Sequence, residues 1–294
     1  MNKQRLELKL GEMNLAYSLY SQSTAQNSSP RRMVMLHGAG VAGELTWTFI
    51  SNYLQHWDEI LIPDLLGMGG SYFDADDHES FTIEDICSSI FSLLRHHHWQ
   101  TFDLVGYSLG GLVALELNHQ SCIELDSNSK TDYRVDHLCL IEPALFSDQS
   151  LQAAIVFRQA FTPIAANIRT EPDNSDHFID FLDLVSPGRK SNSKMDLLAV
   201  QRLQARPFGF ANALAAVSKY AEALTEQKLH QLIAAIPKGL GIVGGLSNPG
   251  LLLAQEKIKN HQALWQIEVL PNTDHSLVYV RPKVVAQLIN QYLG

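Results

Sequence analysis

Short apolar runs alternate with longer amphipathic stretches along most of the chain. Near the N-terminus, residues 4–10 and 13–20 alternate polar and apolar positions around Gly11, which predicts two strands joined as a hairpin. Further strands are predicted from apolar runs at 32–36, 59–62, 102–105, 137–141, 240–243 and 266–270. Helices are predicted at 43–55, 81–98, 109–118, 251–260 and 283–292. Near-continuous apolar strands separated by helices are typical of a parallel sheet covered on both faces.

This alternation is interrupted between residues 147 and 235. The segment has the periodicity of helices, most clearly at 211–224, and it contains no convincing strand. We therefore predict an α/β fold with a mostly parallel central sheet of about eight strands, covered by helices. Residues 1–146 and 236–294 are expected to form the core, and residues 147–235 an inserted helical cap or lid.

The composition is that of an ordered globular protein with a large apolar core. The chain has 294 residues, 46% of them hydrophobic, and a formal net charge of −9 at pH 7. This negative charge argues against nucleic acid or an anionic membrane surface as a partner. The N-terminal residues lack the apolar core of a signal peptide, and no stretch is long and uncharged enough to span a bilayer. We expect a soluble cytoplasmic protein.

Cysteine and histidine spacing offers no metal or redox site. Cys87, Cys122 and Cys139 stand in apolar stretches and are expected to be packed thiols in a reducing compartment. Residues 96–98 are three consecutive histidines at a predicted helix end, where neighbouring side chains point in different directions. No carboxylate or cysteine completes a metal site there. We predict neither a metal nor a cofactor.

The pentad Gly106-Tyr107-Ser108-Leu109-Gly110 is the most informative motif. It follows the predicted strand at 102–105 and opens a predicted helix. A serine at this spacing between glycines is the pattern of a nucleophile elbow, in which a strand turns sharply into a helix and holds the serine oxygen above the sheet. The small flanking residues avoid the clashes that larger side chains would make in such a turn.

Other polar residues fall where predicted strands end. They are His37, Asp64, Glu142 and, in the loop before the last helix, His275. In open α/β sheets, ligands bind beyond the carboxyl ends of the strands. A serine nucleophile needs a base to take its proton and a third group to orient that base. His275 follows Ser108 in chain order, which makes it the candidate base, whereas His37 and Asp64 are expected to support loops.

The chain resembles the α/β-hydrolase superfamily in four motifs. These are His37-Gly38, Asp64 with the run at 67–71, the elbow at 106–111, and Asp274-His275-Ser276. The resemblance covers nearly the whole chain except 147–235, which matches only the general idea of a lid. It implies that Ser108 is the nucleophile and His275 the base. It also implies that the backbone N–H groups of Ala39 and Leu109 form the oxyanion hole.

The chain departs from this family at the position of the acid. Most members carry an aspartate shortly after the seventh strand, but the corresponding run at 244–249 places Asn248 there. Some relatives carry the acid after the sixth strand, and Glu142 stands at that position. We therefore assign the acid to Glu142. A purely structural, hydrogen-bonded carboxylate at the sheet edge remains an alternative for Glu142, and Asp274 is a third, weaker candidate because it is adjacent to His275.

These motifs favour a serine hydrolase that cleaves a carboxylic ester or thioester of a small molecule through an acyl-enzyme on Ser108. A carbon–carbon bond hydrolase or lyase on the same scaffold is one alternative. A non-catalytic binding protein that has lost its acid is another, and Asn248 motivates it. Within the predicted lid, five arginines and six phenylalanines have two interpretations. The arginines could bind an anionic substrate or form solvated faces, and we favour solvated faces. The phenylalanines could line an acyl pocket or pack the lid itself, and we favour packing of the lid.

Overall fold

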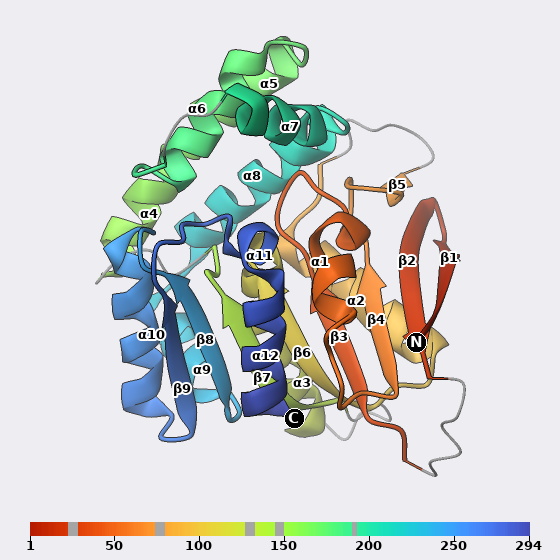
Figure 1. Ribbon diagram of the computed structural model, residues 1–294. Helices are drawn as coiled ribbons and strands as arrows, with labels where there is room; N and C mark the ends of the chain where they lie inside the picture. The colour runs from red at the N-terminus through yellow and green to blue at the C-terminus, as the bar shows by residue number, and fades with distance from the viewer. Residues whose placement is uncertain (23–28, 74–79, 127–132, 145–149, 190–192) are drawn as a thin grey trace.

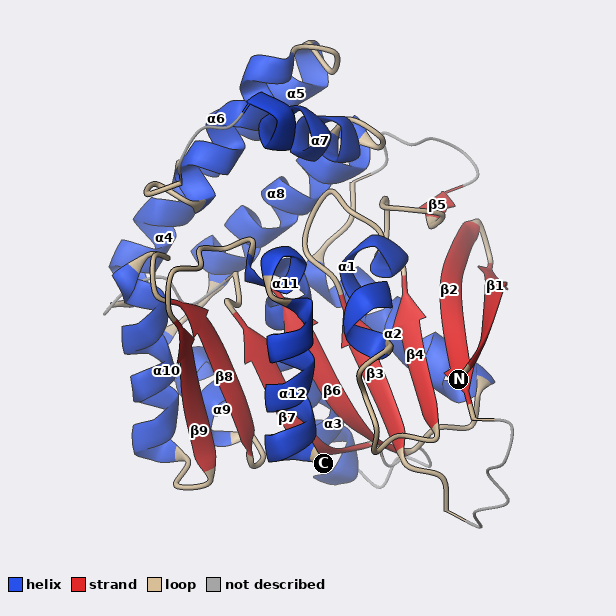
Figure 2. Ribbon diagram, viewed as in Figure 1, coloured by secondary structure: helices blue, strands red, loops and turns tan. Residues whose placement is uncertain are grey.

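One mostly parallel sheet crosses the part of the protein that the computed structural model describes, residues 1–22, 29–73, 80–126, 133–144, 150–189 and 193–294 (Figures 1 and 2). Its strands are β1 (Asn2–Leu10), β2 (Met13–Ser21), β3 (Arg32–Leu36), β4 (Glu59–Pro63), β5 (Tyr72–Phe73), β6 (Thr101–Tyr107), β7 (Arg134–Ile141), β8 (Gly239–Gly244) and β9 (Trp265–Leu270). The order is β1-β2-β4-β3-β6-β7-β8-β9, with β5 beside β2. β2 pairs antiparallel with β1, β4 and β5, and the strands from β4 to β9 are parallel. The predicted fold class is confirmed.

Helices cover both faces of the sheet, as the apolar strands require. On one face lie α1 (Gly43–Ser51), α11 (Leu277–Val280) and α12 (Pro282–Leu293) (Figure 1). Trp47 of α1 and Ile289 of α12 are buried in the hydrophobic cluster on this face. The other face carries α2 (Ile83–His96), α3 (Leu109–Asp126), α9 (Glu226–Ala234) and α10 (Pro249–His261). No helix among the described residues is both long enough and apolar enough to cross a membrane.

Five helices lie beyond the carboxyl ends of the parallel strands (Figure 1). They are α4 (Leu151–Gln159), α5 (Phe161–Thr170), α6 (Ser175–Val185), α7 (Ser193–Leu203) and α8 (Pro207–Ala223). Phe161, Phe178 and Phe210 belong to a hydrophobic cluster of their own in this layer. The described residues of the predicted cap contain no strand, as expected. Its boundaries stay a prediction, because residues 146 and 147 lie outside the described residues.

Three differences between the structure and the expected elements are informative. The two-residue strand β5 and the short helix α11 have too few positions to show a period. The helix predicted at 109–118 continues to Asp126 as α3. Asn118, which marked its expected end, is buried and donates a hydrogen bond to the backbone oxygen of Ala235, at 2.9 Å. A tertiary contact therefore accommodates the polar residue within the helix.

Candidate active site

Ser108 lies at the sharp turn between β6 and α3. Its backbone is in the left-handed region, with φ of 55°, a strained conformation for a residue other than glycine. The turn needs glycine on both sides. A Cβ on Gly106 would lie 2.3 Å from the backbone oxygen of Gly110, and a Cβ on Gly110 would lie 2.3 Å from that of Leu36. The local geometry is thus that of the elbow expected from the sequence.

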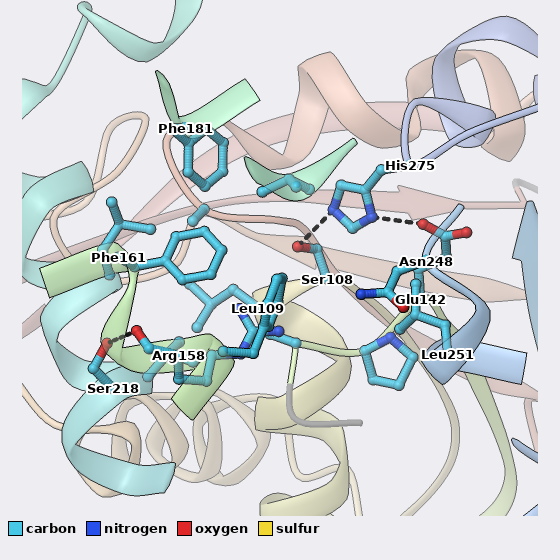
Figure 3. Close-up of a pocket in the computed structure, with 17 residues that line it drawn as sticks. Ser108, Leu109, Glu142, Arg158, Phe161, Phe181, Ser218, Asn248, Leu251 and His275 are labelled. Carbon is cyan, nitrogen blue, oxygen red and sulfur yellow. Dashed lines mark hydrogen bonds and ion pairs between the residues drawn. The ribbon is translucent and has the colours of Figure 1, made fainter. Parts of the chain in front are cut away.

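His275 stands beside Ser108 in the loop between β9 and α11. Its Nε2 atom is 3.0 Å from Ser108 Oγ (Figure 3). The Tyr107 hydroxyl donates a hydrogen bond to the backbone oxygen of His275, at 2.7 Å. Burial raises the pKa of the Tyr107 phenol well above its usual value, so the hydroxyl remains a donor. Tyr107 therefore anchors the loop that carries the imidazole.

Glu142 contacts the other side of the same imidazole. It follows β7, has φ of 46°, and is fully buried. Its Oε2 atom lies 2.6 Å from His275 Nδ1, and its Oε1 atom accepts a hydrogen bond from the backbone N–H of Gly244, at 2.7 Å. A chain of hydrogen bonds therefore joins Ser108, His275 and Glu142 (Figure 3).

The two other candidates for the acid have different partners. The Asn248 side-chain oxygen accepts a hydrogen bond from the backbone N–H of Gly250, at 2.9 Å, and caps α10. The Asp274 carboxylate accepts hydrogen bonds from the backbone N–H and the hydroxyl of Ser276, at 2.9 and 2.6 Å. Among the described residues, Glu142 is the candidate whose side chain bonds to the His275 ring.

Two hollows meet at Ser108. The first, which we call the narrow chamber, has a free volume of about 50 Å³, and the second, the wide chamber, has about 530 Å³. Both are lined by Ala39, Ser108, Phe181, Val185 and His275. The wall of the narrow chamber also includes Leu109, Phe157, Arg158, Phe161, Leu214 and Leu251. Ser108 therefore borders the free space of both chambers.

The two predicted oxyanion-hole residues lie in these walls. Ala39 borders both chambers and Leu109 borders the narrow one, next to Ser108. Leu109 is the first residue of α3, so its N–H has no intrahelical partner. Backbone N–H groups at a helix N-terminus favour negative charge. The positions are compatible with two donors near the serine, and their role as an oxyanion hole stays a prediction.

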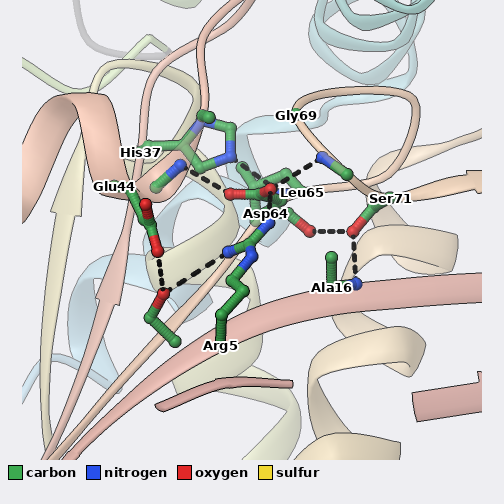
Figure 4. Close-up of polar contacts among 12 residues, drawn as sticks. Arg5, Ala16, His37, Glu44, Asp64, Leu65, Gly69 and Ser71 are labelled. Carbon is green, nitrogen blue, oxygen red and sulfur yellow. Dashed lines mark hydrogen bonds and ion pairs between the residues drawn. The ribbon is translucent and has the colours of Figure 1, made fainter. Parts of the chain in front are cut away.

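His37 and Asp64 support the loops around the site (Figure 4). His37 is buried; its Nδ1 donates to the Gly38 oxygen at 2.7 Å and its Nε2 accepts from the N–H of Leu65 at 2.8 Å. Burial lowers the pKa of His37, in keeping with the neutral ring that these two bonds require. The Asp64 carboxylate is also buried, and neither residue lines the two chambers. Both therefore have the structural role expected from the sequence.

Asp64→Asn is expected to lower the free energy of unfolding by about 2–4 kcal/mol. The carboxylate accepts hydrogen bonds from the N–H groups of Gly43 and Gly70, both at 2.7 Å, and pairs with Arg5 (Figure 4). The asparagine amide has the same shape but no charge. Its NH₂ group, itself a donor, would face one of the backbone N–H groups that now donate to the carboxylate. Urea denaturation measures the effect. Asp136→Asn, at an exposed ion pair with Arg134, is the control and should change stability by less than about 0.5 kcal/mol; equal effects would contradict this role for Asp64.

The described residues suggest no metal ligands. They contain no group of three or more His, Cys, Asp or Glu side chains that is placed to hold a metal ion. Cys87 and Cys139 are buried in the two hydrophobic layers, and burial raises the pKa of both thiols. They remain protonated and pack as small apolar side chains.

Several solved structures share this fold. The enol-lactonase from Burkholderia xenovorans LB400 aligns with 98% of this chain and 99% of its own, at 16% identity and a TM-score of 0.70. MenH from S. aureus aligns with 94% of this chain and 97% of its own, at 16% identity and a TM-score of 0.73. At such low identity the likeness concerns the fold alone.

One curated relative matches part of the sequence. RutD of Yersinia enterocolitica, a candidate carbamate hydrolase, is 29% identical over 109 residues. The match covers 36% of this chain and 38% of the relative. The sequence model of the alpha/beta hydrolase family, in contrast, matches residues 33–288, which include all the site residues described above. The chain belongs to the alpha/beta hydrolase family.

Proposed function

We propose that the protein is a serine hydrolase that cleaves a carboxylic ester or thioester through an acyl-enzyme on Ser108. The observation that carries the proposal is the hydrogen-bond chain from Ser108 Oγ through the His275 ring to the buried Glu142 carboxylate. A hydroxyl becomes an effective nucleophile when an adjacent base takes its proton and a third group orients that base. Glu142 supplies the negative charge that Asn248 lacks, so the main reason to consider a non-catalytic binding protein is weakened.

The proposed reaction has two halves. Ser108 Oγ attacks the acyl carbonyl while its proton passes to His275 Nε2, and the N–H groups of Ala39 and Leu109 bind the oxyanion. His275 then protonates the leaving alcohol or thiol, which departs and leaves the acyl group on Ser108. In the second half, His275 takes a proton from water, the water oxygen attacks the acyl-enzyme, and the proton returns to Ser108 as the carboxylic acid leaves. Glu142 stabilises the imidazolium in both halves.

The sizes of the two chambers suggest how the substrate lies. An ester bound at Ser108 extends its acyl part to one side of the carbonyl and its leaving group to the other. The first product must leave and water must enter before the acyl-enzyme can be hydrolysed, and both movements need space. We therefore assign the leaving group to the wide chamber, about 530 Å³, and the acyl group to the narrow one, about 50 Å³.

A fluorophosphonate probe tests the nucleophile directly. We expect the wild-type protein to be labelled, because the probe reacts with a serine activated by a base. Ser108→Ala should abolish labelling, and Ser92→Ala on α2 should retain it. Absence of labelling in the wild type would favour the binding-protein alternative. Labelling without ester or thioester turnover would favour a carbon–carbon bond hydrolase, a lyase, or a hydrolase of carbamates, the activity named for the Yersinia relative.

A further inference from the structure

The five arginines of the predicted lid have different surroundings. Arg169 donates to the Asn212 side chain, Arg189 pairs with Asp183 and Asp196, Arg206 donates to the backbone oxygen of Gly69, and Arg202 is exposed above the Tyr279 ring. These contacts of four arginines are ordinary surface and lid interactions. Arg158 of α4 differs, because it lines the narrow chamber together with Ser108.

The Arg158 guanidinium packs against two neighbouring aromatic rings. Its central carbon is 5.2 Å from the ring centroid of Phe157 and 5.1 Å from that of Phe161. Its Nε atom is shielded from solvent and has no hydrogen-bond partner among the described residues. No carboxylate of the described residues pairs with it. Figure 3 shows Arg158 and Phe161 on the side of Ser108 away from Glu142.

A cation in this position is poorly compensated. Burial lowers the pKa of Arg158 to about 9, so it still carries its charge at neutral pH. The phenylalanine faces attract the cation, but they bring no negative charge. Arg158 is half-buried, and a buried donor without a hydrogen-bond partner, such as its Nε, is costly unless an anion joins it. The net charge of −9 means that the protein as a whole repels anions. Arg158 instead places a positive charge in the wall of the narrow chamber.

We propose that Arg158 binds a carboxylate at the far end of the acyl group, which makes esters or thioesters of short dicarboxylic acids the preferred substrates. This inference rests on the proposed function, because it assigns the acyl group to the narrow chamber. Guanidinium and carboxylate form paired hydrogen bonds of matching geometry. The free volume of about 50 Å³ admits only about three to five water-sized groups. An acyl chain of succinate size fits this limit.

The experiment compares monoethyl succinate with ethyl succinamate, in which a neutral amide of the same shape replaces the carboxylate. For the wild type we expect kcat/KM to favour the carboxylate by about 10- to 100-fold, the usual range for a charged hydrogen bond that is lost. Arg158→Gln should reduce this preference to less than about threefold, because the carboxylate ester then loses its cationic partner while the amide ester has none to lose. Arg158→Lys should retain part of the preference, because it keeps the charge without the paired donors.

Arg202→Gln is the matched comparison, because Arg202 lines the wide chamber and is exposed. The carboxylate preference should survive in this variant. Its loss in Arg202→Gln, with retention in Arg158→Gln, would overturn the proposal by placing the anion in the other chamber. Equal turnover of the two esters by the wild type would also overturn it. If both esters turn over too slowly, their inhibition constants against p-nitrophenyl acetate hydrolysis give the same ratio.

Failure of this inference can be told apart from failure of the proposed function. A wild-type protein that hydrolyses p-nitrophenyl acetate and reacts with a fluorophosphonate, but does not discriminate between the two ethyl esters, refutes the carboxylate site alone. A protein that does neither refutes the serine hydrolase itself. Should Arg158→Gln fail to fold, as a thermal melt would reveal, the wild-type preference and the Arg158→Lys variant still decide the question.

Discussion

Ser108→Ala is expected to lower kcat for hydrolysis of an activated ester by about 10⁴- to 10⁶-fold. In the proposed mechanism, the substitution removes the single oxygen that attacks the carbonyl and accepts the acyl group. It keeps the Cβ, so the turn between Gly106 and Gly110 meets no new steric conflict. Spectrophotometric release of p-nitrophenol from p-nitrophenyl butyrate measures the effect.

Two controls make the Ser108→Ala result interpretable. A thermal melt should show little change in stability, because the alanine side chain is smaller and has the same backbone requirement. Ser92→Ala, made in parallel, should keep wild-type turnover. Residual activity above about 1% in Ser108→Ala, with contaminating esterase excluded by titration with the probe, would refute Ser108 as the nucleophile.

Glu142→Gln is expected to lower kcat by about 10³- to 10⁴-fold. The glutamine has nearly the same shape but no charge to stabilise the imidazolium. Both carboxylate oxygens now accept hydrogen bonds, one from His275 Nδ1 and one from the Gly244 N–H. The amide nitrogen of glutamine must face one of these two donors, so either the histidine or the sheet loses an acceptor. Initial rates at saturating ester measure kcat.

Asn248→Ala is the matched variant for the acid assignment. Because Asn248 caps α10 and does not hydrogen-bond to the histidine, its replacement should change kcat by less than about threefold and cost about 1 kcal/mol of stability. A small effect at Glu142 beside a large one at Asn248 would reverse the assignment. Urea denaturation of both variants separates a catalytic loss from partial unfolding.

Local patterns in the sequence predict much of this molecule. The apolar runs at 32–36 and 102–105 correspond to β3 and to part of β6, because a strand buried on both faces leaves a continuous apolar signature. The pentad around Ser108 indicated the sharp turn, because a side chain at either of its glycines would clash with nearby backbone. His275 was reached through chain order, and the structure brings it to Ser108 across 167 residues.

Other features depend on tertiary neighbours and leave no local pattern. Glu142 and Asn248 were both plausible acids, and the choice depends on which side chain reaches the His275 ring. The position of Glu142 follows from the pairing of β7 with β8, which strand periodicity does not reveal. Arg158 was one of five arginines with the same interpretation. Among the described residues, its distinction is a buried Nε without a hydrogen-bond partner and the packing of its guanidinium against two rings, both produced by helix packing.

The attachment of Glu142 to the sheet has a consequence for how specificity can change. Its backbone N–H donates to Ile242 at 3.2 Å and its side chain accepts from Gly244, so β8 itself holds the carboxylate in place. If Glu142 is the acid, as we propose, the turn at 245–248 does not need to supply one. Asn248, at that turn, borders the narrow chamber. Asn248 can therefore be substituted to change acyl selectivity without removing the proposed acid. In relatives that carry their catalytic aspartate at this turn, the same substitution would remove the acid.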